Sequence, residues 1–254
     1  MPVFTNPISS QNQGSAAGII GYPAIGSIKQ YIVFSDEFNR EVLNPTGTVA
    51  LYTQANNAGT GTTTMTGSQA NIATTGSSSD DTTLRTSELV FTRTSDLDFR
   101  TQLNINITFN LSSNSNVQYF VGIVKQVSQL TGLPTTTRHL GCYVDTSASN
   151  NMILSSANGT SQVTTDTLSA VSSTAIYKLT INLNGDDSAV ITLSQSAAGS
   201  TSGSLIFTNI SSQTVTSLCA GSTFFSGNEI HFYVKTLTTA TKTLAIREYN
   251  IQAL

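Results

Sequence analysis

Residues 102–112 read QLNINITFNLS, and this stretch decides the fold class. Apolar residues stand at every second position, with asparagine or threonine between them: Leu103, Ile105, Ile107, Phe109 and Leu111. Such strict alternation is typical of a β-strand with one buried and one solvated face. The polar face carries no charge, although charge is the usual way to keep an exposed strand face soluble. We expect its asparagines to face away from the core: Asn104, Asn106 and Asn110.

Further segments of this kind follow one another from residue 31 onward, and none shows a sustained helical period. The expected strands are 31–38, 48–54, 84–93, 102–112, 117–127, 139–146, 151–157, 175–185, 188–196, 204–211, 229–235 and 243–251. Two packed antiparallel sheets are the simplest way to bury so many apolar faces. The sequence therefore predicts an all-β protein with the antiparallel two-sheet architecture of a sandwich.

Local signals refine this prediction. The turn residues at 184–187 (NGDD) predict a hairpin between two of the strands. In the last strand, Leu244 and Ile246 fall on one face by alternation, whereas Tyr249 and Ile251 fall on the other. One extra residue near 247–248 would bring all four onto a single buried face, so we expect a β-bulge near Arg247 and Glu248. The polar stretches 55–83, 128–138 and 196–203 are expected to be surface loops.

Residues 1–30 differ from the remainder, which forms the expected sandwich domain, 31–254. Scattered Pro, Gly and Ser give neither strand nor helical periodicity, yet apolar side chains recur. An arm that lies extended against another surface would carry such residues, whereas a disordered leader is the alternative. If the segment is an arm, its partner-binding residues are expected to be Phe4, Ile8, Ile19, Ile20, Tyr22 and Ile25.

Composition excludes several classes of function. Charged residues make up 10% of the 254 residues, against about 25% in a typical soluble domain, while Ser and Thr together number 74. No basic run is present to neutralise phosphates, so we expect no nucleic-acid partner. No apolar stretch is long enough to span a membrane, so we expect no membrane partner.

Residues 31–254 resemble the concanavalin-A-like jelly roll, also called the laminin-G or laminarinase-type sandwich. The resemblance begins with FSDEFNREVLNPTG (34–47) and continues through VQYFVGIVK (117–125), LGCYVD (140–145) and NGTSQV (158–163). It closes with IYKLTINLNGDDSAVITLS (176–194) and FYVKTLTTATKTLAIREYNIQ (232–252). The resemblance implies a jelly-roll sandwich, and it supports a fold more than a function.

Jelly rolls with neutral surfaces rich in Ser, Thr and Asn recur in virion proteins of tailed bacteriophages, and this chain is similar to that group. The resemblance implies a non-enzymatic capsid decoration or cement protein, anchored by its arm to the major capsid protein or another virion protein. It also implies self-association, with a homotrimer expected, and assembly into the virion in the host cytoplasm. The alternative is a fibre or tail adhesin that binds a host glycan.

Catalytic residues are not expected. Laminarinase-type enzymes carry E-x-D-x-x-E, and the five glutamates do not form this pattern; Glu37 and Glu41 come nearest. The two histidines, His139 and His231, are interpreted as surface or interface residues, with Glu229 on the same strand face as His231. A Ser–His–Asp site would need three groups in mutual reach, and nothing in the sequence indicates one.

Cofactors and metals are not expected either. Lectins of this fold bind calcium through Asp and Asn, and the candidates here are Asp80 with Asp81, Asp186 with Asp187, and Asp36 with Asn39. Acidic pairs on turns are normally part of the turn itself. Cys142 and Cys219 are interpreted as buried free thiols, with a disulfide as the alternative. The absence of Trp weakens the case for a platform on which sugars stack.

Overall fold

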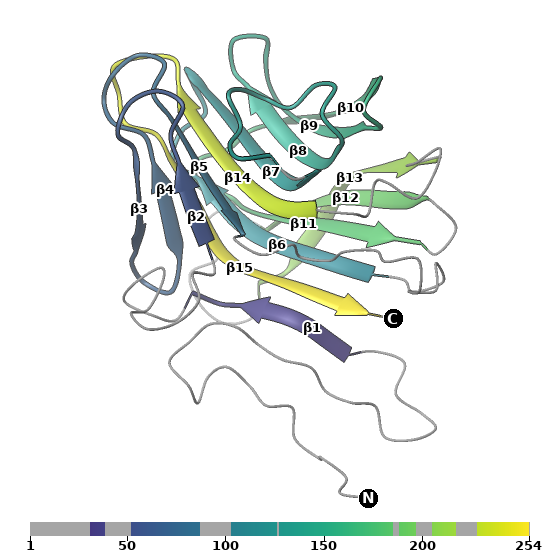
Figure 1. The fold of residues 1–254 in the computed structure, drawn as a ribbon. Coiled ribbons are helices and arrows are strands. Elements are labelled where there is room, and N and C mark those ends of the chain that lie inside the picture. The colour runs from purple at the N-terminus through teal and green to yellow at the C-terminus, as the bar shows by residue number, and fades with distance from the viewer. Residues whose placement is uncertain are drawn as a thin grey trace, which may run out of the picture.

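The computed structural model describes residues 31–38, 52–86, 103–125, 127–184, 188–196, 205–216 and 228–253. Every regular element in these ranges is a β-strand, and all strand pairs are antiparallel. The strands form two sheets that pack face to face (Figure 1). The expected two-sheet sandwich is confirmed. The expected arm, with Phe4, Ile8, Ile19, Ile20, Tyr22 and Ile25, lies outside the described residues.

One sheet has eight strands. Its order is β13 (Phe207–Val215), β12 (Ala189–Ser196), β11 (Ile176–Leu183), β6 (Leu103–Leu111), β15 (Thr243–Ala253), β4 (Ala70–Ala73) and β3 (Thr62–Met65). The eighth strand, β1 (Tyr31–Asp36), pairs with residues 249–253 of β15, while β4 pairs with residues 243–246 of the same strand. The first and last described strands therefore meet in this sheet.

The other sheet has seven strands. Its order is β10 (Gln162–Ala170), β9 (Ser149–Ala157), β8 (His139–Asp145), β7 (Val117–Lys125), β14 (Asn228–Thr236), β5 (Asp81–Thr86) and β2 (Tyr52–Ala55). Figure 1 shows β7, β8, β9 and β14 side by side in the upper part of the view. This sheet carries the candidate site.

The apolar halves of the strands fill the space between the sheets. From β6, Ile105, Ile107, Phe109 and Leu111 are buried, and they join one continuous core with residues of the facing sheet such as Phe232. Period-two alternation places these side chains on one face of each strand. The expectation drawn from QLNINITFNLS is confirmed for its apolar face.

The polar half of β6 lies on the outer face of the eight-stranded sheet, as expected. Asn104, Asn106 and Asn110 are half-buried rather than fully exposed, because neighbouring strands carry polar partners. The Asn106 side chain donates to Asn250 (Nδ2 to Oδ1, 3.2 Å), and Thr180 Oγ1 donates to Asn106 Oδ1 at 2.9 Å. Amides of β6 thus find partners across the strands, while the charged side chains on this face, Lys178 and Glu248, come from the neighbouring strands.

Two local predictions are confirmed. β11 and β12 pair in register from Leu183 opposite Ala189, so the hairpin is present. The register of β15 against β6 shifts between Ile246 and Glu248, at the position where the parity switch predicted a bulge.

Three strands escaped prediction. The expected loop 55–83 contains β3 and β4 as well as the first residues of β5, so that prediction was wrong. β3 reads TTTM and β4 reads ANIA, and such short strands have too few apolar residues to show alternation. β10 reads QVTTDTLSA and is an edge strand whose apolar residues point to solvent, with Leu168 84% exposed.

A buried polar cluster joins β1, β2 and β15. Asp36, from the FSDEF motif, accepts a hydrogen bond from the Phe38 backbone N–H at 2.7 Å and another from the Tyr52 hydroxyl. The Tyr249 hydroxyl lies 3.0 Å from that of Tyr52, and burial raises the pKa of Tyr52 well above its ordinary value. The carboxylate of Asp36 therefore has a structural role.

The described ranges include no helix able to cross a membrane.

Candidate functional site

The candidate site lies on the outer face of the seven-stranded sheet. On β8, Leu140, Cys142 and Val144 point into the core, so His139, Gly141, Tyr143 and Asp145 point the other way. The strand register continues this face through Gly122 and Phe120 of β7 and through His231 and Tyr233 of β14. Half of the face is covered by a loop, and half is open.

Residues 127–138, the covering loop, lie over one half of the face. A second, smaller core forms beneath this loop from Phe120, Val124, Leu130 and Tyr233, with Leu133 packed against it. The loop is also held by hydrogen bonds, since its carbonyls accept from the Arg85 Nε–H (Ser128, 3.1 Å) and from Gln162 (Pro134, 3.3 Å). The expected loop at 128–138 is present, and it acts as a lid over the sheet rather than as a free surface segment.

Two glycines make room for this smaller core. Gly122 and Gly141 face each other in neighbouring strands, and the Phe120 ring lies against both. A Cβ added at Gly141 would stand 2.4 Å from the Val121 carbonyl oxygen and 3.0 Å from the Phe120 ring. Both positions need glycine because of this close approach.

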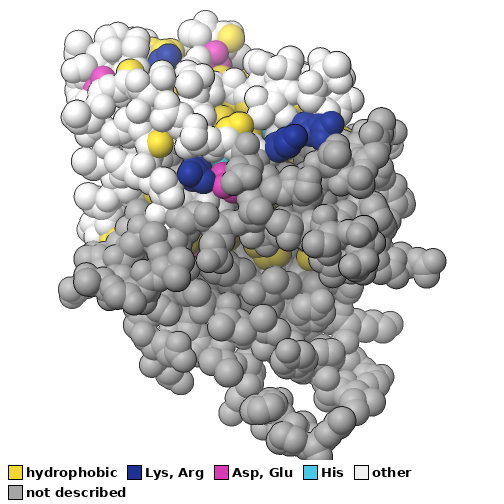
Figure 2. Space-filling view, in the orientation of Figure 1, with side chains coloured by type: hydrophobic (Ala, Val, Ile, Leu, Met, Phe, Trp, Pro, Cys, Tyr) yellow, Lys and Arg dark blue, Asp and Glu magenta, His cyan; other side chains and the backbone are white. Residues whose placement is uncertain are grey.

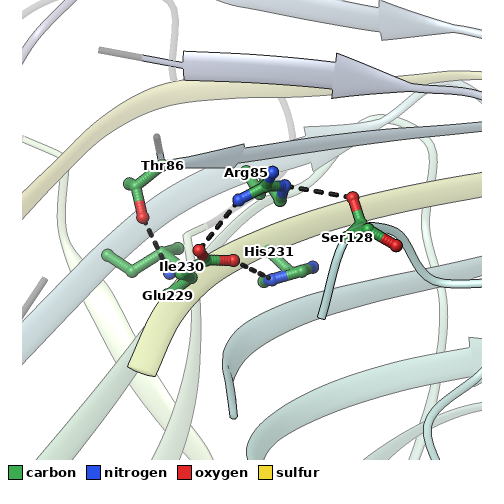
Figure 3. Close-up of polar contacts among 6 residues, drawn as sticks. All are labelled: Arg85, Thr86, Ser128, Glu229, Ile230 and His231. Atoms are coloured by element: carbon green, nitrogen blue, oxygen red, sulfur yellow. Dashed lines mark hydrogen bonds and ion pairs between the residues drawn. The ribbon is translucent and has the colours of Figure 1, made fainter. Parts of the chain in front are cut away.

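An ion-paired cluster lies beside the smaller core (Figure 3). Arg85 of β5 reaches Glu229 of β14, with 2.8 Å between Nη1 and Oε1, and the other Glu229 oxygen lies 3.1 Å from His231 Nε2. The Glu229 and His231 side chains are at most 1% exposed. His231 was expected at the surface or at an interface, on the same strand face as Glu229, and that prediction was wrong: alternation places both side chains on the outward face, yet both are buried.

The His231 imidazole is held in its neutral form. Burial lowers its pKa, and although Glu229 raises the pKa through its hydrogen bond and its charge, burial has the larger effect. A neutral ring donates its Nε2 proton to Glu229, and its Nδ1 atom has no partner among the described residues. The cluster is thus a closed ion pair with no exposed reactive atom.

Glu229 and Asp81, two buried carboxylates among the described residues of this face, are too far apart to act together in glycoside hydrolysis. Asp81 of β5 lies opposite Lys235 of β14, and Glu229 is six residues from Lys235 along β14. Glu229 is therefore about 20 Å from Asp81 along the strand direction. Glycosidases need two carboxyl groups roughly 5 to 9.5 Å apart. Glu229 and Asp81 therefore do not form such a pair.

The candidate calcium ligands serve turns where the structure describes them. Asp81 Oδ1 accepts hydrogen bonds from the backbone N–H groups of Asn57 (2.7 Å) and Ala58 (3.1 Å), and Asp80 accepts one from Ser77. Within the described ranges, no three His, Cys, Asp or Glu side chains gather as a metal site would require. Asn39, Asp186 and Asp187 lie outside those ranges.

The open half of the face presents a tyrosine near two carboxylates, with Ile153 of β9 between Tyr143 and Asp166 in the strand register. We call it the Tyr143 platform, made of Tyr143, Asp145, Asn151 and Asp166. Tyr143 is half-exposed and packs by one side against the smaller core. Its pKa is raised by partial burial and by the charges of Asp145 and Asp166. Asn151 Nδ2 donates to both Asp166 oxygens, at 3.0 and 3.1 Å. An apolar ring with fixed acceptors around it suits a ligand that has both C–H faces and hydroxyl groups.

A polar pocket opens near the other end of β8. It has a volume of about 410 Å³ and is lined by three threonines and by Lys125, Arg138, Asn158 and Gly159; we call it the Lys125 pocket. Figure 2 shows that Lys and Arg side chains are few on the face in view, and that most of the described surface there is neither charged nor apolar. A pocket lined by two cations is therefore unusual for this protein.

His139 anchors this pocket from below. It is fully buried rather than at the surface, so its expected exposure was also wrong. Burial lowers the pKa of His139 to about 4, and the neutral ring spans 2.6 Å from Nδ1 to the Thr137 carbonyl and 2.7 Å from Nε2 to Ser155 Oγ. When the ring proton of His139 is on Nδ1, that nitrogen donates to Thr137 and Nε2 accepts from the Ser155 hydroxyl. The Ser155 hydroxyl oxygen also accepts a hydrogen bond from the Gln162 side chain.

Sequence reasoning did not single out the residues of either site. Tyr143, Asp145, Asp166 and Arg138 were not among the residues expected to form a site. A local signal was present for two of them, since Arg138 directly precedes β8 and Asp145 ends it, whereas Tyr143 and Asp166 lie within strands. Cys142 is a buried free thiol, as interpreted from the sequence, whereas Cys219 lies outside the described residues.

No protein-family model and no curated protein matches the chain. Solved structures do match, among them SO2946 from Shewanella oneidensis MR-1, a protein of unknown function (13% identity, TM-score 0.57, 100% of this chain and 96% of that chain). A second is lectin UEA-II complexed with galactose (10% identity, TM-score 0.57, 88% of this chain and 99% of that chain). A third is the CBM2 module of the evolved Dit of Lactobacillus casei BL23 phage J-1 (12% identity, TM-score 0.53, 88% of this chain and 96% of that chain). At such identities the likeness shows the fold alone, and this chain shares the jelly-roll sandwich of lectins.

Proposed function

We propose that this protein is a non-enzymatic, glycan-binding domain of a phage virion, acting as an adhesin. The observation that carries the proposal is the Tyr143 platform, where a half-exposed ring is flanked by the carboxylates of Asp145 and Asp166. Sugar hydroxyls would donate to these carboxylates, while the ring would cover a C–H face of the sugar.

The acceptors of the platform are already positioned. Asp145 accepts from Gln118 (3.0 Å) and from the backbone N–H (3.0 Å) and hydroxyl (2.6 Å) of Ser147. Asp166 accepts from Asn151 at both oxygens and from the Leu168 backbone N–H at 2.7 Å. Each carboxylate has about four lone-pair sites, so these bonds leave acceptor capacity for a ligand. Fixed acceptors lower the ordering cost of binding.

The comparisons support this proposal at the level of fold. Matching structures include a lectin in complex with galactose and a carbohydrate-binding module of a phage protein. A virion setting would also suit the neutral composition of this chain, with 10% charged residues. The proposed location is the virion, assembled in the host cytoplasm.

The absence of enzymatic activity is part of the proposal. Glu229 and His231 are an acid and a base in contact with each other, and both side chains are at most 1% exposed. A general acid or base must come within hydrogen-bonding reach of its substrate. Binding without turnover is therefore the expected behaviour.

Capsid decoration remains a second candidate, and the outer face of the eight-stranded sheet favours it. The side chains of Asn104, Asn106 and Asn250 on this face bond one another. Neutral amides cost less to desolvate than charges do, and this amide patch adds no like-charge repulsion between copies, which suits a symmetric assembly such as a homotrimer.

One experiment separates the two candidates. The full-length protein is applied to a glycan array, and in parallel it is mixed with empty tailed-phage capsids, with and without residues 1–30. Selective glycan binding with the protein left free of capsids supports the adhesin. Capsid binding with a blank array refutes the adhesin and supports decoration, and binding that survives removal of residues 1–30 contradicts arm anchoring.

A further inference from the structure

The Lys125 pocket has a charge unlike that of the rest of the protein. The chain has 11 Lys and Arg against 14 Asp and Glu, with a net charge of -3. Lys125 and Arg138 nevertheless share one pocket, and none of its lining residues is acidic. Such a concentration of positive charge favours an anionic group over a neutral one.

The walls of the pocket are rigid. The Asn158 side-chain oxygen accepts from the backbone N–H groups of Thr160 and Ser161, both at 3.0 Å, and closes the turn. Arg138 Nε donates to the Asn158 carbonyl at 2.9 Å. The Arg138 side chain lies close to the backbone of Gly159, whose φ is +98°. A Cβ at position 159 would stand 2.9 Å from Arg138 Nε, so glycine is needed for this approach. The guanidinium is therefore held in place before any ligand arrives.

The opposite wall is fixed by buried groups. Thr137 is tied through its carbonyl to the buried His139, which is bonded in turn to Ser155. Gln162 links Ser155 to Pro134 at the start of the wall. A pocket whose cations and hydroxyls are preorganised loses little entropy on binding.

We propose that the Lys125 pocket binds the carboxylate or sulfate group of an acidic oligosaccharide. Arg138 and Lys125 pair with the anion, and the threonine hydroxyls and Asn158 contact the sugar that carries it. This inference rests on the proposed function, since it names the class of glycan. By strand alternation Arg138 shares the parity of the core-facing Leu140, whereas Tyr143 points outward, so the Lys125 pocket and the Tyr143 platform are separate sites.

The test is an array of matched oligosaccharide pairs, each with a neutral member and a member carrying a uronic acid, sialic acid or sulfate. The proteins compared are the parent, the K125Q/R138Q variant and the control K178Q/R247Q. The control removes the same charges from the other sheet, where Lys178 is half-buried and Arg247 is exposed. A third variant, Tyr143→Ala, reports on the platform alone.

The parent is expected to bind the acidic member of at least one pair about tenfold more tightly, with a preference that weakens as salt is added. K125Q/R138Q loses the preference and keeps neutral binding, while the control retains both. Equal binding of both members by the parent, or an equal loss in the control, overturns the inference and leaves glycan binding standing. If binding of acidic oligosaccharides survives in Tyr143→Ala but is lost in K125Q/R138Q, the anion site in the Lys125 pocket is supported and sugar binding at the Tyr143 platform is refuted. If the parent binds no oligosaccharide on the array, both proposals are refuted.

Discussion

Arg85 and Glu229 meet 2.8 Å apart, Nη1 to Oε1, on the outer face of a sheet, yet the Glu229 side chain is only 1% exposed. Arg85 also donates from Nε to the Ser128 carbonyl of the covering loop, at 3.1 Å. The pair thus links two strands to the segment that closes over them.

Removing one partner of this pair should be costly. Glu229→Ala leaves Arg85 and His231 without their acceptor, and we expect a loss of about 3 kcal/mol in the free energy of unfolding. The exposed Glu248→Ala should lose under about 1 kcal/mol. Urea unfolding measures both; similar small losses for the two variants would contradict the structural role of the pair.

The Phe120 contact predicts a sharp difference between glycines. Gly141→Ala should destabilise the protein by roughly 2 kcal/mol or more, because the new methyl group meets the Val121 carbonyl and the Phe120 ring. Gly132 has no atom within 4 Å of its added Cβ, so Gly132→Ala should be neutral. Thermal unfolding of the two variants checks this, and equal melting temperatures would argue against the observed packing.

His139 predicts a dependence of stability on pH. Its pKa is about 4 when folded and about 6.5 when unfolded, so between these values only the unfolded chain binds the proton. Stability should therefore fall as the pH drops from about 6.5 to about 4, by about 2.5 kcal/mol between pH 7.5 and 4.5 for this group. His139→Gln should remove that share of the slope in urea unfolding at the two pH values. An unchanged slope would exclude His139 as its source.

Cys142 should resist thiol reagents. It is buried in the core, and burial raises its pKa far above the ordinary value, so the reactive thiolate is suppressed. In a Cys219→Ser background, native protein should not react with a maleimide, whereas urea-unfolded protein should react with one equivalent. Rapid labelling of the native variant would show that Cys142 is accessible.

The fold was predictable where alternation was strong. Ile105 and Ile107 identified a buried strand, and the parity switch near Glu248 located the bulge, because both signals are local. β10 was not predictable, since an edge strand with Leu168 in solvent has no buried face to reveal it.

The site was less accessible to sequence reasoning. His231 alternates correctly onto the outer face, yet it is fully buried, and a loop distant in sequence packs Leu130 and Leu133 over the neighbouring part of that face. Tyr143 and Asp166 come together only because β8, β9 and β10 are neighbours. Such proximity depends on strand order, which no local pattern contains.

The central claim, glycan binding at the Tyr143 platform, is tested most directly by calorimetric titration of the parent and Tyr143→Ala with the glycan that the array retains best. Truncating an aromatic anchor at the centre of an interface costs at least about 2 kcal/mol, so the account predicts an affinity loss of roughly 30-fold or more. The double variant D145N/D166N should lose affinity as well, while E248Q, a matched change on the other sheet, should not. An unchanged affinity in Tyr143→Ala would contradict the account.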